Sequence, residues 1–143
     1  MAQIFRRAAR LVVVDPEGFV LLFQYEDDGR KWWATPGGGL ERDETFEQAA
    51  AREASEELAL ALTRFVPLWC LTVNFNFRGQ SINQVERYFL VRTSRDDVKC
   101  GEIVRDAHRL EGIFAAHWWS LAEIETTSAQ LFPKDLCERL RDL

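Results

Sequence analysis

The stretch PGGGLERDETFEQAAAREASEELAL, from Pro36 to Leu60, joins a glycine-rich turn to a segment with helical periodicity. The three glycines Gly37–Gly39 allow positive φ and a close approach to another group, so we expect neither helix nor ordinary strand there. Thr45 followed by Gln48 matches a capping box. The pattern therefore predicts a helix that begins at this point and runs to about Leu58 or a little further.

The predicted helix carries three glutamates on one edge. At about 100° per residue, Glu56 and Glu57 lie roughly 60° and 40° to either side of Glu53. An adjoining stripe of small and aliphatic residues can pack against a sheet: Ala50, Ala54 and Leu58. Like charges at this spacing cost an isolated helix a few tenths of a kcal/mol per pair. Two interpretations stay open, a solvated acidic face or a site for a hard cation.

Mg²⁺ and Mn²⁺ prefer oxygen ligands and bind through a few carboxylates together with substrate phosphate. Arg52, beside the glutamates, either orients a carboxylate through a charge-assisted hydrogen bond or forms an ordinary surface ion pair. Backbone groups of a glycine-rich turn can reach a metal or a phosphate where side chains would obstruct. Together, the glycines and the acidic helix favour a site for a metal and a phosphate.

The rest of the chain predicts strands, turns and a closing helix. Strands are expected over residues 8–14, 19–25, 65–77, 82–93 and 115–119, the last of these being the final strand. A turn at 15–18 joins the first two strands in a hairpin, and residues 78–81 join the next two. Residues 26–31 and 94–110 are expected to be loops, and residues 32–34 a short extended piece. Residues 133–143 predict an amphipathic helix that turns Leu136, Cys137 and Leu140 inward. This order indicates one α/β (α+β) domain over residues 1–143, with helices on a mixed sheet.

Composition limits the classes of function. The 143 residues are 47% hydrophobic and carry 18 Lys and Arg against 23 Asp and Glu, a net charge of -5. This charge argues against a broad nucleic-acid surface but permits a small phosphorylated ligand beside a bound cation. Three cysteines without a CxxC motif predict neither a disulfide framework nor a zinc site. The apolar run Leu11–Val14 is too short for a signal peptide or membrane span, so we expect a soluble cytoplasmic protein without a membrane partner.

The stretch resembles the signature of the Nudix hydrolases, G-x5-E-x7-R-E-U-x-E-E-x-G-U, where U is a bulky aliphatic residue. The matching residues are Gly38, Glu44, Arg52, Glu53, Glu56, Glu57 and Leu60. Ala54 stands where a larger aliphatic residue is usual, and Ala59 replaces the glycine after the helix. Either Ala59 adopts a left-handed cap at a cost of about 1 kcal/mol, or the helix continues through Leu60 or Leu62. The segments RRAAR, WWATPGGGLE and HWWSLAEI are also similar to the family.

The resemblance implies an α/β/α sandwich around a mixed sheet, and Mg²⁺- or Mn²⁺-dependent hydrolysis of a nucleoside diphosphate linked to another moiety. It makes Glu53, Glu56 and Glu57 metal ligands, with the backbone near Gly38 contributing. Arg52 would then hold a glutamate in place. Glu44 would support the junction of loop and helix or bind a metal-linked water. The general base is either Glu53 or a glutamate of a distant loop, for which Glu111 is the first candidate and Glu102 and Glu86 are rivals.

Substrate contacts are expected from Gly37, Gly38, Gly39 and an aromatic platform for the base. Trp33 is the first choice for that platform, and the wider set is Tyr25, Trp32, Phe75 and Phe77, although strand aromatics usually fill a core. His108 and His117 are expected to be structural or surface residues. Two other functions stay open: a nucleotide-binding regulatory domain without turnover, favoured only by Ala59, and an acidic helix used for protein interaction. A homodimer is compatible with the sequence, but no pattern requires one.

Overall fold

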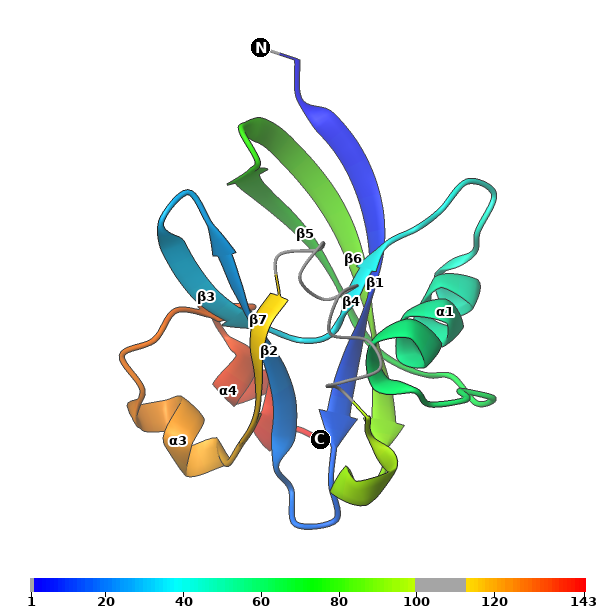
Figure 1. Ribbon diagram of the computed structural model, residues 1–143, viewed down its shortest axis with the longest axis vertical. Helices are drawn as coiled ribbons and strands as arrows, with labels where there is room; N and C mark the ends of the chain where they lie inside the picture. Colours follow the sequence, from blue (N-terminus) through cyan, green and yellow to red (C-terminus); the bar gives the residue numbers. More distant parts are fainter. Residues whose placement is uncertain (1, 100–112) are drawn as a thin grey trace.

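The computed structural model describes residues 2–99 and 113–143. Its elements follow one another along the chain as shown in Figure 1: β1 (Ile4–Val14), β2 (Val20–Asp27), β3 (Arg30–Ala34), β4 (Gly37–Gly39), α1 (Phe46–Leu58), β5 (Val66–Phe77), β6 (Gln80–Arg92), the 3₁₀ helix η1 (Arg95–Asp97), β7 (Ile113–Trp119), α3 (Leu121–Thr126), β8 (Leu131–Phe132) and α4 (Leu136–Arg141). No helix of these described residues is long and apolar enough to cross a membrane.

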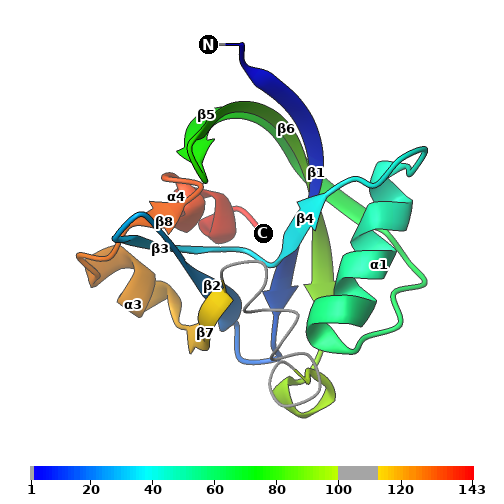
Figure 2. The ribbon, with the colours of Figure 1, turned by 45° about the horizontal axis from the view of Figure 1, so that its top comes forward.

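The described residues form one mixed, strongly curled sheet of eight strands, in the order β5-β6-β1-β2-β3-β8, with β4 paired to β1 and β7 paired to β2. β1 and β6 are parallel along the whole of β1, whereas β5–β6 and β2–β3 are antiparallel hairpins. Figure 2 shows α1 on one side of the sheet and α3 and α4 on the other. The predicted α/β/α sandwich around a mixed sheet is therefore confirmed.

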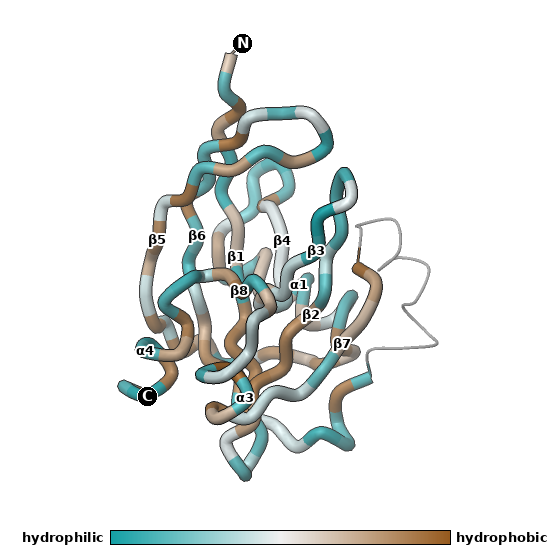
Figure 3. Tube along the Cα trace, turned by 90° about the vertical axis from the view of Figure 1, so that its left-hand side faces the viewer, coloured by the Kyte–Doolittle hydropathy of each residue, from teal (hydrophilic) through white to brown (hydrophobic). Residues whose placement is uncertain are grey.

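Two apolar clusters lie on the two faces of the sheet, because alternate residues of β1 point to opposite sides. Ala9, Leu11 and Val13 pack with α1, whose predicted stripe is fully buried: Ala50, Ala54 and Leu58. Val12 and Val14 face the second cluster, where α4 contributes the buried Leu136 and the partly buried Cys137 and Leu140. Figure 3 shows hydrophobic residues along the inner strands β1 and β2. The inward residues predicted for the closing helix are confirmed, although α4 is shorter than predicted.

The expectation that Gly37–Gly39 would not form a strand is wrong. These residues form β4, which pairs antiparallel with β1 from Ala8↔Gly39 to Arg10↔Gly37. Among the three, only Gly37 has a positive φ, of 135°. A Cβ at Gly37 would lie 2.1 Å from the Ala9 carbonyl oxygen. Glycine is therefore required at these positions mainly because neighbouring atoms lie too close for a side chain. At Gly37 the positive φ is a second reason.

Residues 26–31 are not the predicted loop. They complete β2 and begin β3, with a tight turn at Asp28-Gly29, where φ is 51° and 76°. Positive φ at both central residues is typical of the type I′ hairpin turn, which Asp-Gly favours. The β1–β2 hairpin is antiparallel as predicted, but its strands pair only at Val14↔Val20. Beyond that point β2 pairs with β3 and β7, and β1 with β4 and β6.

The helix end decides between the two expectations for Ala59. The helix stops at Leu58, and Ala59 is left-handed with φ 56° and ψ 34°, so continuation through Leu60 is wrong. The Ala59 N–H donates to the Ser55 carbonyl (3.1 Å) and the Leu60 N–H to the Ala54 carbonyl (3.0 Å), which closes the helix without a glycine.

The C-terminal third contains elements that were not expected. A strand at 115–119 is confirmed within β7, but β8 follows it, so β7 is not the final strand. Ser120 and Glu123 form a capping box that begins α3, a helix the sequence analysis did not include. The predicted loop over 94–110 includes η1, and its remainder from residue 100 lies outside the described residues.

Candidate functional site

The N-terminus of α1 begins where the capping box predicts. The Gln48 N–H donates to Thr45 Oγ1 (3.1 Å), and the Thr45 N–H donates to Gln48 Oε1 (2.9 Å). Because alanines fill the face of the helix against the sheet, α1 lies close to β1 and β4. This fixes the glutamates of its last two turns beside the three glycines of β4. We call these three residues, Gly37–Gly39, the glycine ribbon.

Arg52 is bound to the carboxylates around it. Its Nε and Nη2 atoms donate to the two oxygens of Glu44 (2.8 and 2.9 Å), and Nη1 donates to Glu53 Oε1 (2.9 Å) and Glu56 Oε2 (3.3 Å). Nη2 also donates to the Gly39 carbonyl (3.0 Å). These hydrogen bonds hold the pKa of Glu44 below its ordinary value and raise the pKa of Arg52. The arginine thus ties the loop, the glycine ribbon and the helix together.

Glu53 and Glu57 are buried, with 3% and 2% of their surface exposed, whereas Glu56 is half exposed. Glu57 Oε2 lies 3.4 Å from the Gly37 N–H, which donates to it. Glu53 Oε1 accepts the Arg52 bond, but Glu53 Oε2 is buried and accepts no hydrogen bond from any residue that the structure describes. A buried carboxylate oxygen without a donor is costly, and a cation would remove that cost.

The glycine ribbon makes room for this carboxylate. A Cβ at Gly38 would lie 2.6 Å from Glu53 Oε1, so any larger residue would push the glutamate away. The oxygen donors fit a hard cation such as Mg²⁺ or Mn²⁺. Across residues 2–99 and 113–143, no three His, Cys, Asp or Glu side chains converge closely enough to hold a metal. In this arrangement Arg52 is the counterion of the glutamates, so the predicted ligand set stays a prediction.

A second buried polar cluster lies on the other face of the sheet, centred on Glu86. Its Oε2 accepts from Arg10 Nε (3.1 Å) and Gln84 Nε2 (2.7 Å), and its Oε1 accepts from the Tyr88 hydroxyl (2.9 Å). Burial alone would lower the pKa of Arg10, but the charge of Glu86 raises it. Burial and Glu86 raise the pKa of Tyr88. Since both carboxylate oxygens are engaged, Glu86 is poorly suited to take a proton from water.

Arg10 connects this cluster to the glycine ribbon. Its Nη1 donates to the carbonyls of Thr35 (3.3 Å) and Gly37 (3.4 Å), on the segment that leads into β4. Arg10 was not among the residues predicted for the site. One signal for it exists, because an arginine directly before four apolar residues of a buried strand needs an acidic partner.

The adjacent tryptophans of β3 contact different partners, as strand alternation predicts. Trp33 packs edge-on against Trp119, with ring centroids 5.3 Å apart, and against His117 at 6.3 Å. Trp32 stacks on Tyr25 at 5.9 Å and meets Phe77 edge-on at 6.3 Å. Trp32 therefore connects the β2–β3 and β5–β6 hairpins, while a role of Trp33 in substrate binding stays a prediction. Other predicted residues lie outside the described residues: Glu102, His108 and Glu111.

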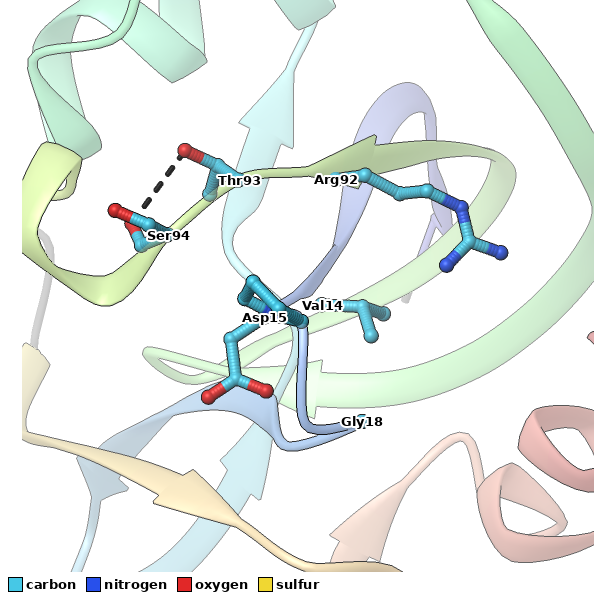
Figure 4. A pocket seen from close by; sticks show the side chains of 7 residues that line it. Val14, Asp15, Gly18, Arg92, Thr93 and Ser94 are labelled. Carbon is cyan, nitrogen blue, oxygen red and sulfur yellow. Dashed lines mark hydrogen bonds between the residues drawn. The ribbon is translucent and has the colours of Figure 1, made fainter.

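A hollow at the far end of β1 does not belong to this site. Figure 4 shows its lining, in which the side chains of Asp15 and Arg92 point in different directions. Asp15 accepts hydrogen bonds from the N–H groups of Glu17 (3.0 Å) and Phe19 (2.8 Å) and from Arg95 Nε (2.6 Å). Its carboxylate therefore stabilises the turn between β1 and β2.

Residues 4–140 match the family model described as the NUDIX domain. No curated protein matches the chain. Solved structures are similar over nearly its whole length. For the MutT NUDIX hydrolase from Burkholderia pseudomallei the TM-score is 0.71 at 20% identity, covering 99% of both chains.

Two further structures are similar to the chain. The dihydroneopterin triphosphate pyrophosphohydrolase of E. coli has a TM-score of 0.68 at 15% identity, with 99% of this chain and 97% of that chain covered. The NUDIX domain of Shewanella oneidensis NrtR, complexed with ADP ribose, has a TM-score of 0.66 at 20% identity, with 99% and 88% covered. At these identities the structures establish a common fold.

Proposed function

The chain belongs to the Nudix family of hydrolases, and we propose that it cleaves the diphosphate of a nucleoside diphosphate derivative with Mg²⁺ or Mn²⁺. The observation that carries the metal requirement is the buried Glu53, whose Oε2 has no donor among the described residues and which lies against Gly38. A divalent cation is the ligand that compensates such an oxygen and also attracts a diphosphate.

The residues divide the work by position. Glu53, Glu56 and Glu57, with the backbone near Gly38, would hold the cation. Such a cation neutralises phosphate oxygens and lowers the pKa of water. Arg52 holds the Glu53 carboxylate toward the glycine ribbon. The carboxylate that accepts the proton of the attacking water would be Glu53 or a glutamate of a distant loop, with Glu111 as the first candidate and Glu102 as its rival.

Glu44 has a supporting role in this proposal. It accepts two hydrogen bonds from Arg52 and one from the Glu41 N–H (2.8 Å), which fixes the loop before α1. The low pKa of Glu44 keeps it ionised at neutral pH, so that it compensates part of the Arg52 charge. Arg52 can then bind Glu53 without neutralising it completely.

The test is hydrolysis of a panel of nucleoside diphosphate derivatives with Mg²⁺. The panel includes nucleotide sugars, dinucleoside polyphosphates and ADP-ribose, which one similar structure binds. Dihydroneopterin triphosphate, the compound in the name of another similar structure, is added as a phosphate anhydride without a nucleoside. We expect hydrolysis to phosphate-containing products, and we expect EDTA and Glu57→Gln to abolish it. Glu47 is an exposed glutamate of the same helix, so the control variant Glu47→Gln should leave the rate unchanged. Hydrolysis that persists in EDTA would contradict the metal requirement. Tight binding without products would favour a nucleotide-binding domain. The absence of both binding and products would refute the proposal.

A further inference from the structure

Two arginines of β1 lie on the face of the sheet opposite α1. Arg6 and Arg10 are four residues apart on the strand and so point to the same side, away from Ala9 and Leu11, which pack against α1. Arg10 is paired with Glu86 at 3.1 Å. The Arg6 side chain is half-buried, and in the part of the chain that the structure describes it has no hydrogen-bond partner and no carboxylate within 4.0 Å.

The surroundings of Arg6 are unfavourable for an isolated cation. Burial lowers the pKa of Arg6, and the positive charge of Arg10 lowers it further, while the charges of Glu86 and Glu53 act in the opposite direction. A guanidinium that has lost part of its water and is repelled by a neighbour gains most from an anion. Folding alone therefore gives no reason for a cation at this position.

The place of Arg6 indicates which anion it meets. A Cβ at Gly39 would lie 2.4 Å from Arg6 Nη2, so the guanidinium lies directly against the glycine ribbon. The carbonyl of the same Gly39 accepts from Arg52 Nη2. Gly39 thus contacts two arginines, of which Arg52 is bound to carboxylates and Arg6 is not. Glycine at 39 is what allows this approach.

We propose that Arg6 binds a phosphate oxygen of the substrate at the edge of the glycine ribbon. A guanidinium can bind two phosphate oxygens at once, and these charge-assisted bonds strengthen where water is partly excluded. This inference rests on the proposed function, because it takes the substrate to be a diphosphate. Arg6 would then be a positioning residue on β1, in addition to the acidic residues of α1.

The chain offers a matched control, because Arg7 is the next residue of β1, is exposed and points to the other face. KM, kcat and inhibition by imidodiphosphate, a non-hydrolysable diphosphate, are measured for Arg6→Gln, Arg7→Gln and Arg6→Lys on the best substrate. We expect Arg6→Gln to raise KM and the inhibition constant at least about tenfold with kcat little changed. Arg7→Gln changes both less than about twofold, and Arg6→Lys recovers part of the loss because it keeps the charge.

Thermal unfolding separates binding from folding. Since Arg6 has no ion pair with a described residue and is repelled by Arg10, Arg6→Gln should leave the melting temperature unchanged or raise it. Equal KM and inhibition constants for Arg6→Gln and Arg7→Gln, or a large loss of stability in Arg6→Gln, would overturn the inference while leaving the hydrolase intact. A wild-type protein that hydrolyses nothing in the panel would overturn the proposed function and this inference together.

Discussion

Replacing Ala59 by glycine should stabilise the protein, and the structure sets the size of the effect. Ala59 has φ 56° and ψ 34°, a left-handed conformation that costs an L-residue roughly 1–2 kcal/mol relative to glycine. Glycine also gives the unfolded chain more conformational freedom, and this cancels about 0.4–1 kcal/mol of the gain. Taking the middle of each range, the net expectation is a gain of about 0.8 kcal/mol in the free energy of unfolding.

The gain converts into a measurable temperature shift. At about 2.1 cal/mol/K per residue, the 143 residues give an unfolding entropy of about 0.3 kcal/mol/K. Ala59→Gly should therefore raise the melting temperature by about 3 °C in scanning calorimetry. Ala61→Gly is the matched control, since Ala61 is also exposed, lies two residues on and lacks a positive φ. It should leave the melting temperature unchanged or lower it.

The same variant tests the activity of the wild-type chain. Glu53, Glu56 and Glu57 precede the cap, so Ala59→Gly should leave the rate of hydrolysis unchanged. An unchanged or lower melting temperature, or an equal rise in Ala61→Gly, would refute the argument from backbone strain. Hydrolysis that appears only in Ala59→Gly would instead favour a domain that binds nucleotides without turnover.

Three further predictions concern the ribbon and its supports. Gly37→Ala places a Cβ 2.1 Å from a backbone oxygen at φ 135°, so urea unfolding should show a loss of about 3 kcal/mol or more. In Gly38→Ala the nearest atoms to the new Cβ belong to the Glu53 side chain, which can move, so the protein should stay folded while hydrolysis falls about tenfold or more; an unchanged rate would contradict this. Glu44 has a pKa below its ordinary 4.5, so its contribution is present above pH 4.5 and is lost as the pH falls through the lowered value. Glu44→Gln should thus cost about 1.5–3 kcal/mol at pH 7 and progressively less as the pH falls below 4.5, and a difference independent of pH would argue against an ionised Glu44.

Local signals predicted much of this fold. The capping box of Thr45 and Gln48 marks the start of α1, and the alanine stripe marks its buried face, because both depend on residues three or four apart. The turn at Asp28-Gly29 carried an equally local signal that the sequence analysis did not use. The glycine ribbon is different, because its pairing with residues 8–10 depends on contacts about thirty positions away along the chain.

The site shows the same division. The spacing of the motif located Glu53, Glu57 and Arg52, because their geometry is that of one helix. Arg10 and Glu86 could not be paired from spacing, since their contact depends on the parallel register of β1 and β6, where Ala8 lies opposite Glu86. Sequence periodicity contains no information about that register until the strands are aligned.

The charges explain why an acidic helix edge exists here at all. A solvated acidic face requires exposed glutamates, but only Glu56 is exposed, while Glu53 and Glu57 are 3% and 2% exposed. Removing ionised carboxylates from water costs several kcal/mol each, and apolar residues would pack this face at lower cost. Arg52 offsets part of the cost but leaves Glu53 Oε2 without a donor in the described residues. Arg6, against the same glycine ribbon, has the opposite charge and no carboxylate within 4.0 Å among them. In the proposed function, a diphosphate with a divalent cation would bring both charges at once, so that one ligand would compensate two costs that folding leaves in place.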